Sequence, residues 1–325
     1  MGYRTFRGHF QDTMTTRETP LPLTVLSGFL GAGKTTLVNH LLRHANGQKI
    51  LVLVNDFGNL PIDRDLIEAE NGNLLTLANG CACCSMGGDL FEAFVTALEF
   101  DPAPDQLLIE ASGVAEPARI ANYAKAEPDL RLNAIVTVVD GENFLSSDRD
   151  HRVEHVVQEQ ISSAHLLLLN KCDRINDTRK QNVLKQLKQL NPSTSVIEMV
   201  KGQVPTNLVF DIVPISKSSQ EVITNPHDHG DIFESWSFQT DQAFRPADLR
   251  KILEDLPPSV LRFKGIFQAK PTFEPWTAHK VGSHIEISRH TGSALLPQRT
   301  EFVAIGAKGA DILTSLNKSF SDGAT

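Results

Sequence analysis

The sequence predicts an α/β fold, with a mainly parallel sheet in the first domain and a smaller α+β domain after it. In the first two thirds of the chain, short apolar runs alternate with amphipathic helical patterns. The last hundred residues instead contain strands in series with only two helices. A polar stretch with Pro, Gly and Ser separates these parts. We therefore expect a disordered extension at residues 1–20, a first domain at 21–213, a linker at 214–231 and a second domain at 232–325.

The expected elements follow from these patterns in chain order. Apolar runs predict strands of the first domain at residues 23–27, 50–54, 74–77, 106–109, 134–139, 166–170 and 195–199. Amphipathic patterns predict its helices at residues 35–43, 89–98, 154–163 and 178–190. Several strands are apolar throughout, as expected where helices cover both faces of a sheet. In the second domain we expect strands at 232–238, 260–267, 281–288 and 301–305, and helices at 246–255 and 310–319.

Composition and charge exclude several classes of function. The 325 residues include 31 basic and 39 acidic side chains, for a net charge of −8. Such a chain repels a phosphate backbone, which argues against nucleic acid as a partner. No apolar run reaches the roughly 18 residues that span a bilayer, so we expect no membrane association. The N-terminus has no apolar segment typical of a secretory signal, and we expect a cytoplasmic protein.

A glycine-rich loop predicts a nucleotide site. Residues 28–35 read GFLGAGKT, which fits the pattern G-x-x-x-x-G-K-[ST] between a strand and a helix. In such a P-loop the backbone amides face phosphate oxygens, the lysine reaches the β- and γ-phosphates, and the threonine hydroxyl binds Mg²⁺. The predicted phosphate-binding residues are Gly28, Gly31, Ala32, Gly33, Lys34, Thr35 and Thr36.

A second motif predicts that the nucleotide is GTP or GDP. Residues 170–173 read NKCD and follow a strand of four leucines. The carboxylate of Asp173 can accept hydrogen bonds from N1–H and N2–H₂ of guanine, whereas adenine lacks this pair of donors. We assign Asn170, Lys171 and Asp173 to base recognition. Residues 200–202, after the next strand, are the candidate for the loop that closes over the base.

Carboxylates at strand ends predict the Mg²⁺ and hydrolysis positions. Residues 110–113 read EASG, so Glu110 is expected to hold Mg²⁺ with Thr35, and the Gly113 amide to sense the γ-phosphate. Asp56 follows another strand and could orient the attacking water or bind Mg²⁺; Asp140 is a weaker candidate of the same kind. The alternative for each carboxylate is a helix cap or a surface charge. The predicted catalytic residues are Lys34, Asp56 and Glu110.

Three of the four cysteines gather in one short loop. Residues 79–84 read NGCACC, and thiolates at this spacing suit a soft or borderline ion such as Zn²⁺ or Cu⁺. Cys81, Cys83 and Cys84 supply three ligands, and an open fourth position suits metal transfer better than a structural site. The alternative is that they are small buried hydrophobes, which is what we expect of Cys172.

Taken together, these motifs resemble those of CobW-type GTPases, which are P-loop metallochaperones related to the nickel-insertion GTPases of urease and hydrogenase. The order of GFLGAGKT, NGCACC, EASGVAEP and NKCD is similar to that family, and LP at 256–257, RFKG at 262–265, VG at 281–282 and IG at 305–306 resemble its C-terminal domain. The resemblance implies a GTPase with low intrinsic turnover. It further implies a transition metal bound at the Cys-x-Cys-Cys motif and delivered to a client protein, under control of the nucleotide.

Within that resemblance, our interpretation is a zinc metallochaperone whose client docks on the C-terminal domain. The expected cofactors are GTP or GDP, Mg²⁺ and Zn²⁺. Co²⁺ or Fe²⁺ insertion, and a zinc-sensing regulatory module, are the alternatives, because thiolates accept all three metals. The sequence departs from the family where residues 55–59 read NDFGN in place of NEFGE, and where Ala82 replaces a larger aliphatic residue.

Overall fold

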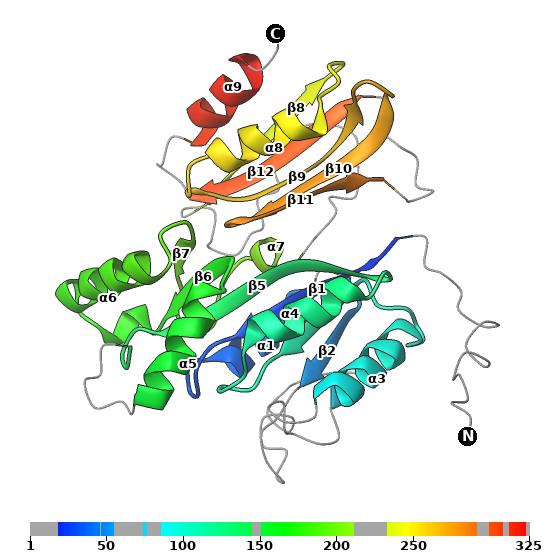
Figure 1. Cartoon of the computed structure of the whole chain (residues 1–325). Coiled ribbons are helices and arrows are strands. Elements are labelled where there is room, and N and C mark those ends of the chain that lie inside the picture. The colour runs from blue at the N-terminus through cyan, green and yellow to red at the C-terminus, as the bar shows by residue number, and fades with distance from the viewer. Residues whose placement is uncertain are drawn as a thin grey trace, which may run out of the picture.

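The computed structural model describes residues 19–45, 47–54, 74–76, 86–144, 151–210, 233–290, 299–307 and 312–322. Within these ranges the chain forms two sheets (Figure 1). The larger sheet has seven strands in the order β3-β2-β4-β1-β5-β6-β7, and each neighbouring pair is parallel. Its strands are β1 Leu21–Ser27, β2 Ile50–Val54, β3 Leu74–Thr76, β4 Gln106–Glu110, β5 Leu130–Asp140, β6 Leu166–Asn170 and β7 Ser195–Glu198.

Helices cover both faces of this parallel sheet. They are α1 Lys34–Arg43, α3 Met86–Leu98, α4 Pro117–Ala126, α5 His151–Ser162, α6 Asp177–Leu190 and α7 Thr206–Val209, with a 3₁₀ turn, η1, at Cys172–Arg174. Alternate leucines of β6 show the two faces: Leu166 and Leu168 pack with α1, whereas Leu167 and Leu169 pack with α5 and α6. Strands buried on both sides explain why the apolar runs predicted them correctly.

The smaller sheet is antiparallel, with the order β11-β10-β9-β12-β8. Its elements are β8 Phe233–Thr240, α8 Pro246–Asp255, β9 Val260–Ala269, β10 Glu274–Val281, β11 His284–Arg289, β12 Thr300–Ala307 and α9 Ile312–Asp322. Side chains of α8 and α9, including Leu253 and Phe320, pack on Phe263 and Phe302 in one apolar core. The predicted fold class, a mainly parallel α/β domain followed by a smaller α+β domain, is therefore confirmed.

The sequence patterns missed β10, α4 and α7. The single strand expected at residues 281–288 covers only the last residue of β10, the turn at Gly282, which has a φ of 53°, and most of β11. A Gly-Ser pair is a turn signal, and the β-branched residues on either side obscured it. We also predicted no helix at α4, although Pro117 stands at its first turn and Ile120, Ala121 and Ala124 form its buried face.

The smaller sheet docks on the face of the parallel sheet that carries α1 and α7. Figure 1 shows α7 between the two sheets. Leu261 of β9 and Val281 of β10 belong to the same buried cluster as Leu208 of α7 and Phe210. The two parts of the chain therefore share one apolar core at this contact.

A buried polar network reinforces the same contact. The guanidinium of Arg262 donates to Asn133 Oδ1 at 3.1 Å, from β9 to β5. The Asn133 amide in turn donates to Thr24 Oγ1 and to the Val209 carbonyl, each at 2.8 Å. The network joins the smaller sheet to α7 and to β1, the strand that leads into the phosphate loop.

We expect Gly282→Ala to destabilise the protein by about 2–5 kcal/mol, from a strained positive φ and an overpacked contact. A Cβ at Gly282 would lie 1.6 Å from the carbonyl oxygen of His165, in the other domain. Denaturant unfolding would measure the loss. Gly47→Ala is the matched control, because Gly47 has a φ of +83° but open space around it, so only the backbone strain applies. Equal losses in the two variants would contradict the interdomain contact.

Two stacked imidazoles at this interface predict acid sensitivity. The rings of His165 and His284 lie 4.5 Å apart with an interplanar angle of 10°. Burial lowers the pKa of His165 to about 3, helped by repulsion from His284 and Lys125. Burial also lowers the pKa of His284 to about 4, with Lys125 contributing. Both rings therefore stay neutral in the folded protein, while the unfolded chain binds their protons below the ordinary pKa of 6.5.

The free energy of unfolding should consequently fall by about 2 kcal/mol for each imidazole between about pH 7 and pH 5. Denaturant titrations at the two pH values measure this fall. His284→Gln should make this fall in the free energy of unfolding smaller by about the contribution of one imidazole. His155→Gln, at an exposed position of α5, should leave the fall unchanged. A fall that is the same in wild type and His284→Gln would refute the assignment.

Candidate functional site

The loop between β1 and α1 has the backbone that the glycine motif predicts. Gly28, Gly31 and Gly33 have φ values of 138°, 73° and 105°, in the region that favours glycine. A Cβ at Gly28 would lie 2.3 Å from the Val138 carbonyl oxygen, and one at Gly33 would lie 2.3 Å from Asn170 Nδ2. Two of the glycines are thus required by close contacts as well as by conformation.

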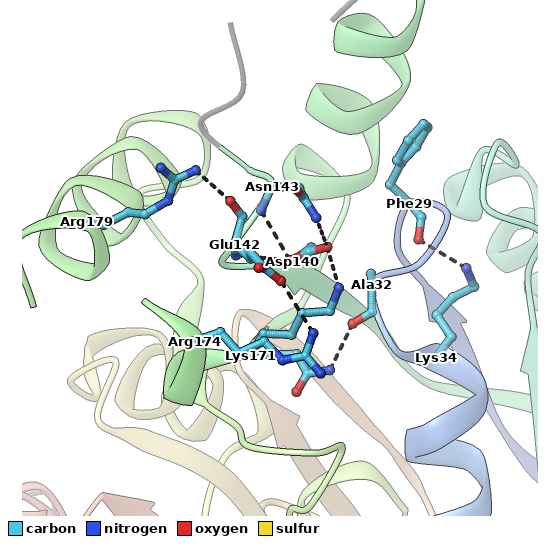
Figure 2. Close-up of polar contacts among 10 residues, drawn as sticks. Phe29, Ala32, Lys34, Asp140, Glu142, Asn143, Lys171, Arg174 and Arg179 are labelled. Carbon is cyan, nitrogen blue, oxygen red and sulfur yellow. Dashed lines mark hydrogen bonds and ion pairs between the residues drawn. The ribbon is translucent and has the colours of Figure 1, made fainter. Parts of the chain in front are cut away.

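Lys34 opens α1 and is buried, with 8% of its surface exposed. Its Nζ donates to the carbonyl oxygen of Gly28 at 2.8 Å. It also donates to the carbonyl oxygen of Phe29 at 3.4 Å (Figure 2), so the side chain folds back across the loop. The ammonium group is therefore placed beside the backbone that would enclose a phosphate.

Thr35 and Glu110 meet at the end of β4. The Thr35 hydroxyl donates to Glu110 Oε1 at 2.9 Å, and Glu110 is buried with 3% of its surface exposed. Hydroxyl and carboxylate oxygens are the ligands that Mg²⁺ prefers, usually together with substrate phosphates. This pair of oxygens next to the phosphate loop fits a bound Mg²⁺.

Asn170 joins the phosphate loop to the segment after β7. Its Nδ2 donates to the Ala32 carbonyl oxygen at 2.9 Å, and its Oδ1 accepts from the Gly202 amide at 3.4 Å. A Cβ at Gly202 would lie 2.9 Å from the amide nitrogen of Leu37 in α1. The structure thus brings the NKCD motif, the phosphate loop and residues 200–202 together.

Lys171 is held by Asp140, the residue that ends β5. Lys171 has a φ of 63°, and its Nζ lies 2.7 Å from Asp140 Oδ2. Asp140 also accepts from the amides of Glu142 and Asn143 (Figure 2). Burial raises the pKa of Asp140, but hydrogen bonds from Lys171 and Asn143 outweigh it and keep the pKa below its ordinary value. Asp140, a weaker candidate for Mg²⁺ or the attacking water, is thus occupied in an ion pair beside the NKCD motif.

Three further predicted residues lie near the same edge of the sheet. Asp173 is exposed in η1, directly after β6. Gly113 follows β4 and lies against the phosphate loop, since a Cβ there would lie 2.8 Å from the Leu30 amide nitrogen. Thr36 is exposed in the first turn of α1.

Gln160 of α5 is a buried polar side chain that the sequence analysis did not single out. Its Nε2 donates to the carbonyl oxygens of Gly113 at 3.1 Å and Ala115 at 3.2 Å. Gln160 follows Val157 by three residues and precedes Ile161, both of which are buried. A glutamine at a core position of an amphipathic helix was the available signal.

Several predicted residues lie outside the described part of the chain: Asp56, Cys81, Cys83 and Cys84. Strand β2 ends at Val54 and β3 at Thr76, and parallel strands end at a common edge of the sheet. Among the described residues there is no group of three or more His, Cys, Asp or Glu that could hold a metal.

Cys172 packs against the apolar cluster under α6, and burial raises the pKa of its thiol, as expected of a small hydrophobe.

In the described ranges, no helix is both long and apolar enough to span a membrane.

Comparison with protein families gives two matches. The nucleotide-binding domain of CobW/HypB/UreG matches residues 22–198, and the C-terminal domain of the cobalamin synthesis protein CobW matches residues 233–320. The chain belongs to the CobW/HypB/UreG family. The predicted resemblance is therefore confirmed over both parts of the chain.

Curated relatives within this family are similar over different lengths. The chain is 33% identical to zinc-regulated GTPase metalloprotein activator 1 of Dictyostelium discoideum over 229 residues, which cover 59% of this chain and 48% of that protein. It is 27% identical to the zinc chaperone CobW of Sinorhizobium sp over 294 residues, covering 78% and 83%. The chain thus spans about half the length of the Dictyostelium relative and most of the Sinorhizobium one.

Among solved structures, the Zn(II)-bound YjiA GTPase of E. coli is similar with a TM-score of 0.46 and 20% sequence identity, covering 94% of this chain and 100% of that one.

Proposed function

We propose that this CobW/HypB/UreG family member is a GTPase metallochaperone, which binds and hydrolyses GTP and delivers zinc to a client protein. The observation that carries the proposal is the meeting of three motifs at one edge of the parallel sheet. Asn170 bonds to the phosphate loop at Ala32, and Thr35 of that loop bonds to Glu110. These contacts join a phosphate-binding loop, a pair of oxygen ligands suited to Mg²⁺ and a motif typical of guanine recognition. Their combination favours a GTP site over a general nucleotide site.

In this proposal the phosphate end of the site is built by Lys34, Thr35 and Glu110. Lys34 Nζ would exchange its bonds to Gly28 and Phe29 for oxygens of the β- and γ-phosphates. Thr35 and Glu110 would hold Mg²⁺, which when bound neutralises charge that develops on the phosphates. The Gly113 amide would contact the γ-phosphate, and Asp56 would orient the attacking water.

The base end would be built by the NKCD motif. Asp173 would accept from guanine N1–H and N2–H₂, and Asn170 would keep the motif in register with the phosphate loop through Ala32. The aliphatic part of Lys171 would lie along the base, because the ion pair with Asp140 fixes its charged end. Residues 200–202, which Asn170 Oδ1 holds through the Gly202 amide, would close over the base.

Zinc is the cargo that we favour. Relatives at 27% and 29% identity are named zinc chaperones, and another relative is named a zinc-regulated GTPase metalloprotein activator. Cys81, Cys83 and Cys84 would bind the ion as thiolates, with the fourth position open for transfer. The client protein would dock on the C-terminal domain. Transfer of Co²⁺ or Fe²⁺ by the same residues, and a sensor that retains its zinc, are the competing outcomes.

Competition binding with a fluorescent GTP analogue tests the nucleotide assignment. Unlabelled GTP should displace the analogue at least about a hundredfold more effectively than ATP, because adenine lacks the pair of donors that the Asp173 carboxylate would accept from guanine. Phosphate release from GTP should require Mg²⁺. Equal displacement by ATP and GTP would contradict the proposal. Transfer is tested separately: zinc-loaded protein should give up zinc to an apo-client on GTP hydrolysis, whereas a sensor would keep it.

A further inference from the structure

Gln160 is a buried polar side chain of α5 that no part of the proposed mechanism uses. Only 1% of its surface is exposed. Its side-chain amide donates to the main-chain carbonyl oxygens of Gly113 and Ala115, and the main-chain carbonyl oxygen of Gln160 accepts from Thr137 Oγ1 at 3.0 Å. These hydrogen bonds fix both the side chain and the main chain of Gln160.

The two carbonyl groups belong to the loop that follows β4. That loop is anchored at one end by the Ala111 amide, which donates to the Leu26 carbonyl oxygen of β1 at 2.9 Å. Within the loop, the Ala115 amide donates to the Ser112 carbonyl oxygen at 3.0 Å. The Gln160 amide provides the second anchor, so Gly113 lies between two fixed points.

Gly113 is in close contact with the phosphate loop, so a shift of Gly113 would change its distance from that loop. A Cβ at Gly113 would lie 2.5 Å from a side-chain carbon of Leu30 and 2.8 Å from the Leu30 amide nitrogen. Leu30 belongs to the glycine-rich motif itself. A displacement of Gly113 by even a fraction of an ångström would therefore move its amide relative to the phosphate cradle.

We propose that Gln160 is a positioning residue that holds the Gly113 loop so that the Gly113 N–H can reach the γ-phosphate. The inference rests on the proposed GTP function and deepens it. Gln160 would act through the carbonyl groups of Gly113 and Ala115, to which its side-chain amide donates. Its loss should weaken the binding of a triphosphate and leave the binding of a diphosphate unchanged, because GDP has no γ-phosphate for Gly113 to contact.

The experiment measures the affinities of GDP and of a non-hydrolysable GTP analogue, both with Mg²⁺, for wild type and Gln160→Met. Methionine fills a similar volume but has no donor for the two carbonyl groups. The ratio of analogue affinity to GDP affinity should fall at least tenfold. Gln160→Glu, which replaces the donor amide with an acceptor-only carboxylate, should lower the ratio in the same way.

Asn191→Leu is the matched control. Asn191 is also a buried amide, and its Nδ2 donates to the carbonyl oxygens of Ile161 and Ala164, at the same C-terminal end of α5 as Gln160. Its loss should lower stability and leave the ratio unchanged. A ratio that stays within twofold of wild type in a folded Gln160→Met or Gln160→Glu protein would overturn the inference. A wild-type protein that binds neither GDP nor the analogue would instead overturn the proposed GTP function.

Discussion

Replacing Asp173 with asparagine is expected to weaken GTP binding by at least about a hundredfold. The carboxylate of Asp173 would accept two hydrogen bonds from guanine, whereas the asparagine amide turns one acceptor into a donor that faces the donor N2–H₂. An unpaired donor in a closed base site costs its full desolvation free energy. Titration calorimetry with GTP measures the loss directly.

The same substitution offers a gain-of-binding check. Xanthosine triphosphate carries a carbonyl oxygen in place of the guanine N2 amine, so it should bind the Asp173→Asn protein better than it binds wild type. Asp177→Asn is the control, since Asp177 is a highly exposed carboxylate four residues further along, paired at the surface with Lys180. GTP affinity unchanged in Asp173→Asn would remove the NKCD motif from base recognition.

Cys83→Ala is expected to weaken Zn²⁺ binding by at least about a hundredfold while GTP affinity stays the same. Losing one of three thiolates leaves two protein ligands for an ion that normally takes four. Chelator competition measures the zinc affinity, and fluorescence titration measures GTP on the same samples.

Cys172→Ala is the matched control for that prediction. The Cys172 thiol donates to the Leu169 carbonyl oxygen and packs against an apolar cluster, so its removal should leave zinc affinity unchanged. If Cys83→Ala binds zinc as tightly as wild type, the Cys-x-Cys-Cys loop is not the metal site.

Local patterns were sufficient to predict the strands of the parallel sheet and the conformation of the phosphate loop. Strands such as β2 and β6 are apolar at nearly every position because helices cover both faces of the sheet, so their signal is strong and continuous. The phosphate loop could also be predicted from its local sequence. Its glycines are a visible pattern because the contacts of Gly28 and Gly33 leave no room for a Cβ. The position of the NKCD motif follows from its place directly after β6.

Long-range contacts could not be predicted in this way. Arg262 and Asn133 are 129 positions apart in the sequence, and nothing in either local pattern indicates the hydrogen bond that joins the two domains. Gln160 was not predicted as a site residue, because its hydrogen-bond partners lie 45 and 47 positions away in the sequence. The hairpin at Gly282 was misread because the turn is only two residues long and its glycine fits against His165 of the other domain.

In the proposed function, the nucleotide state controls the affinity of the protein for the metal. The most direct test is the Zn²⁺ affinity of the full chain, measured by chelator competition with Mg²⁺-GDP and then with a non-hydrolysable Mg²⁺-GTP analogue. Our account predicts affinities that differ by at least tenfold, a coupling free energy of about 1.4 kcal/mol or more. Equal affinities in the two states would contradict it, and the cysteine loop would then be a structural site or a sensor.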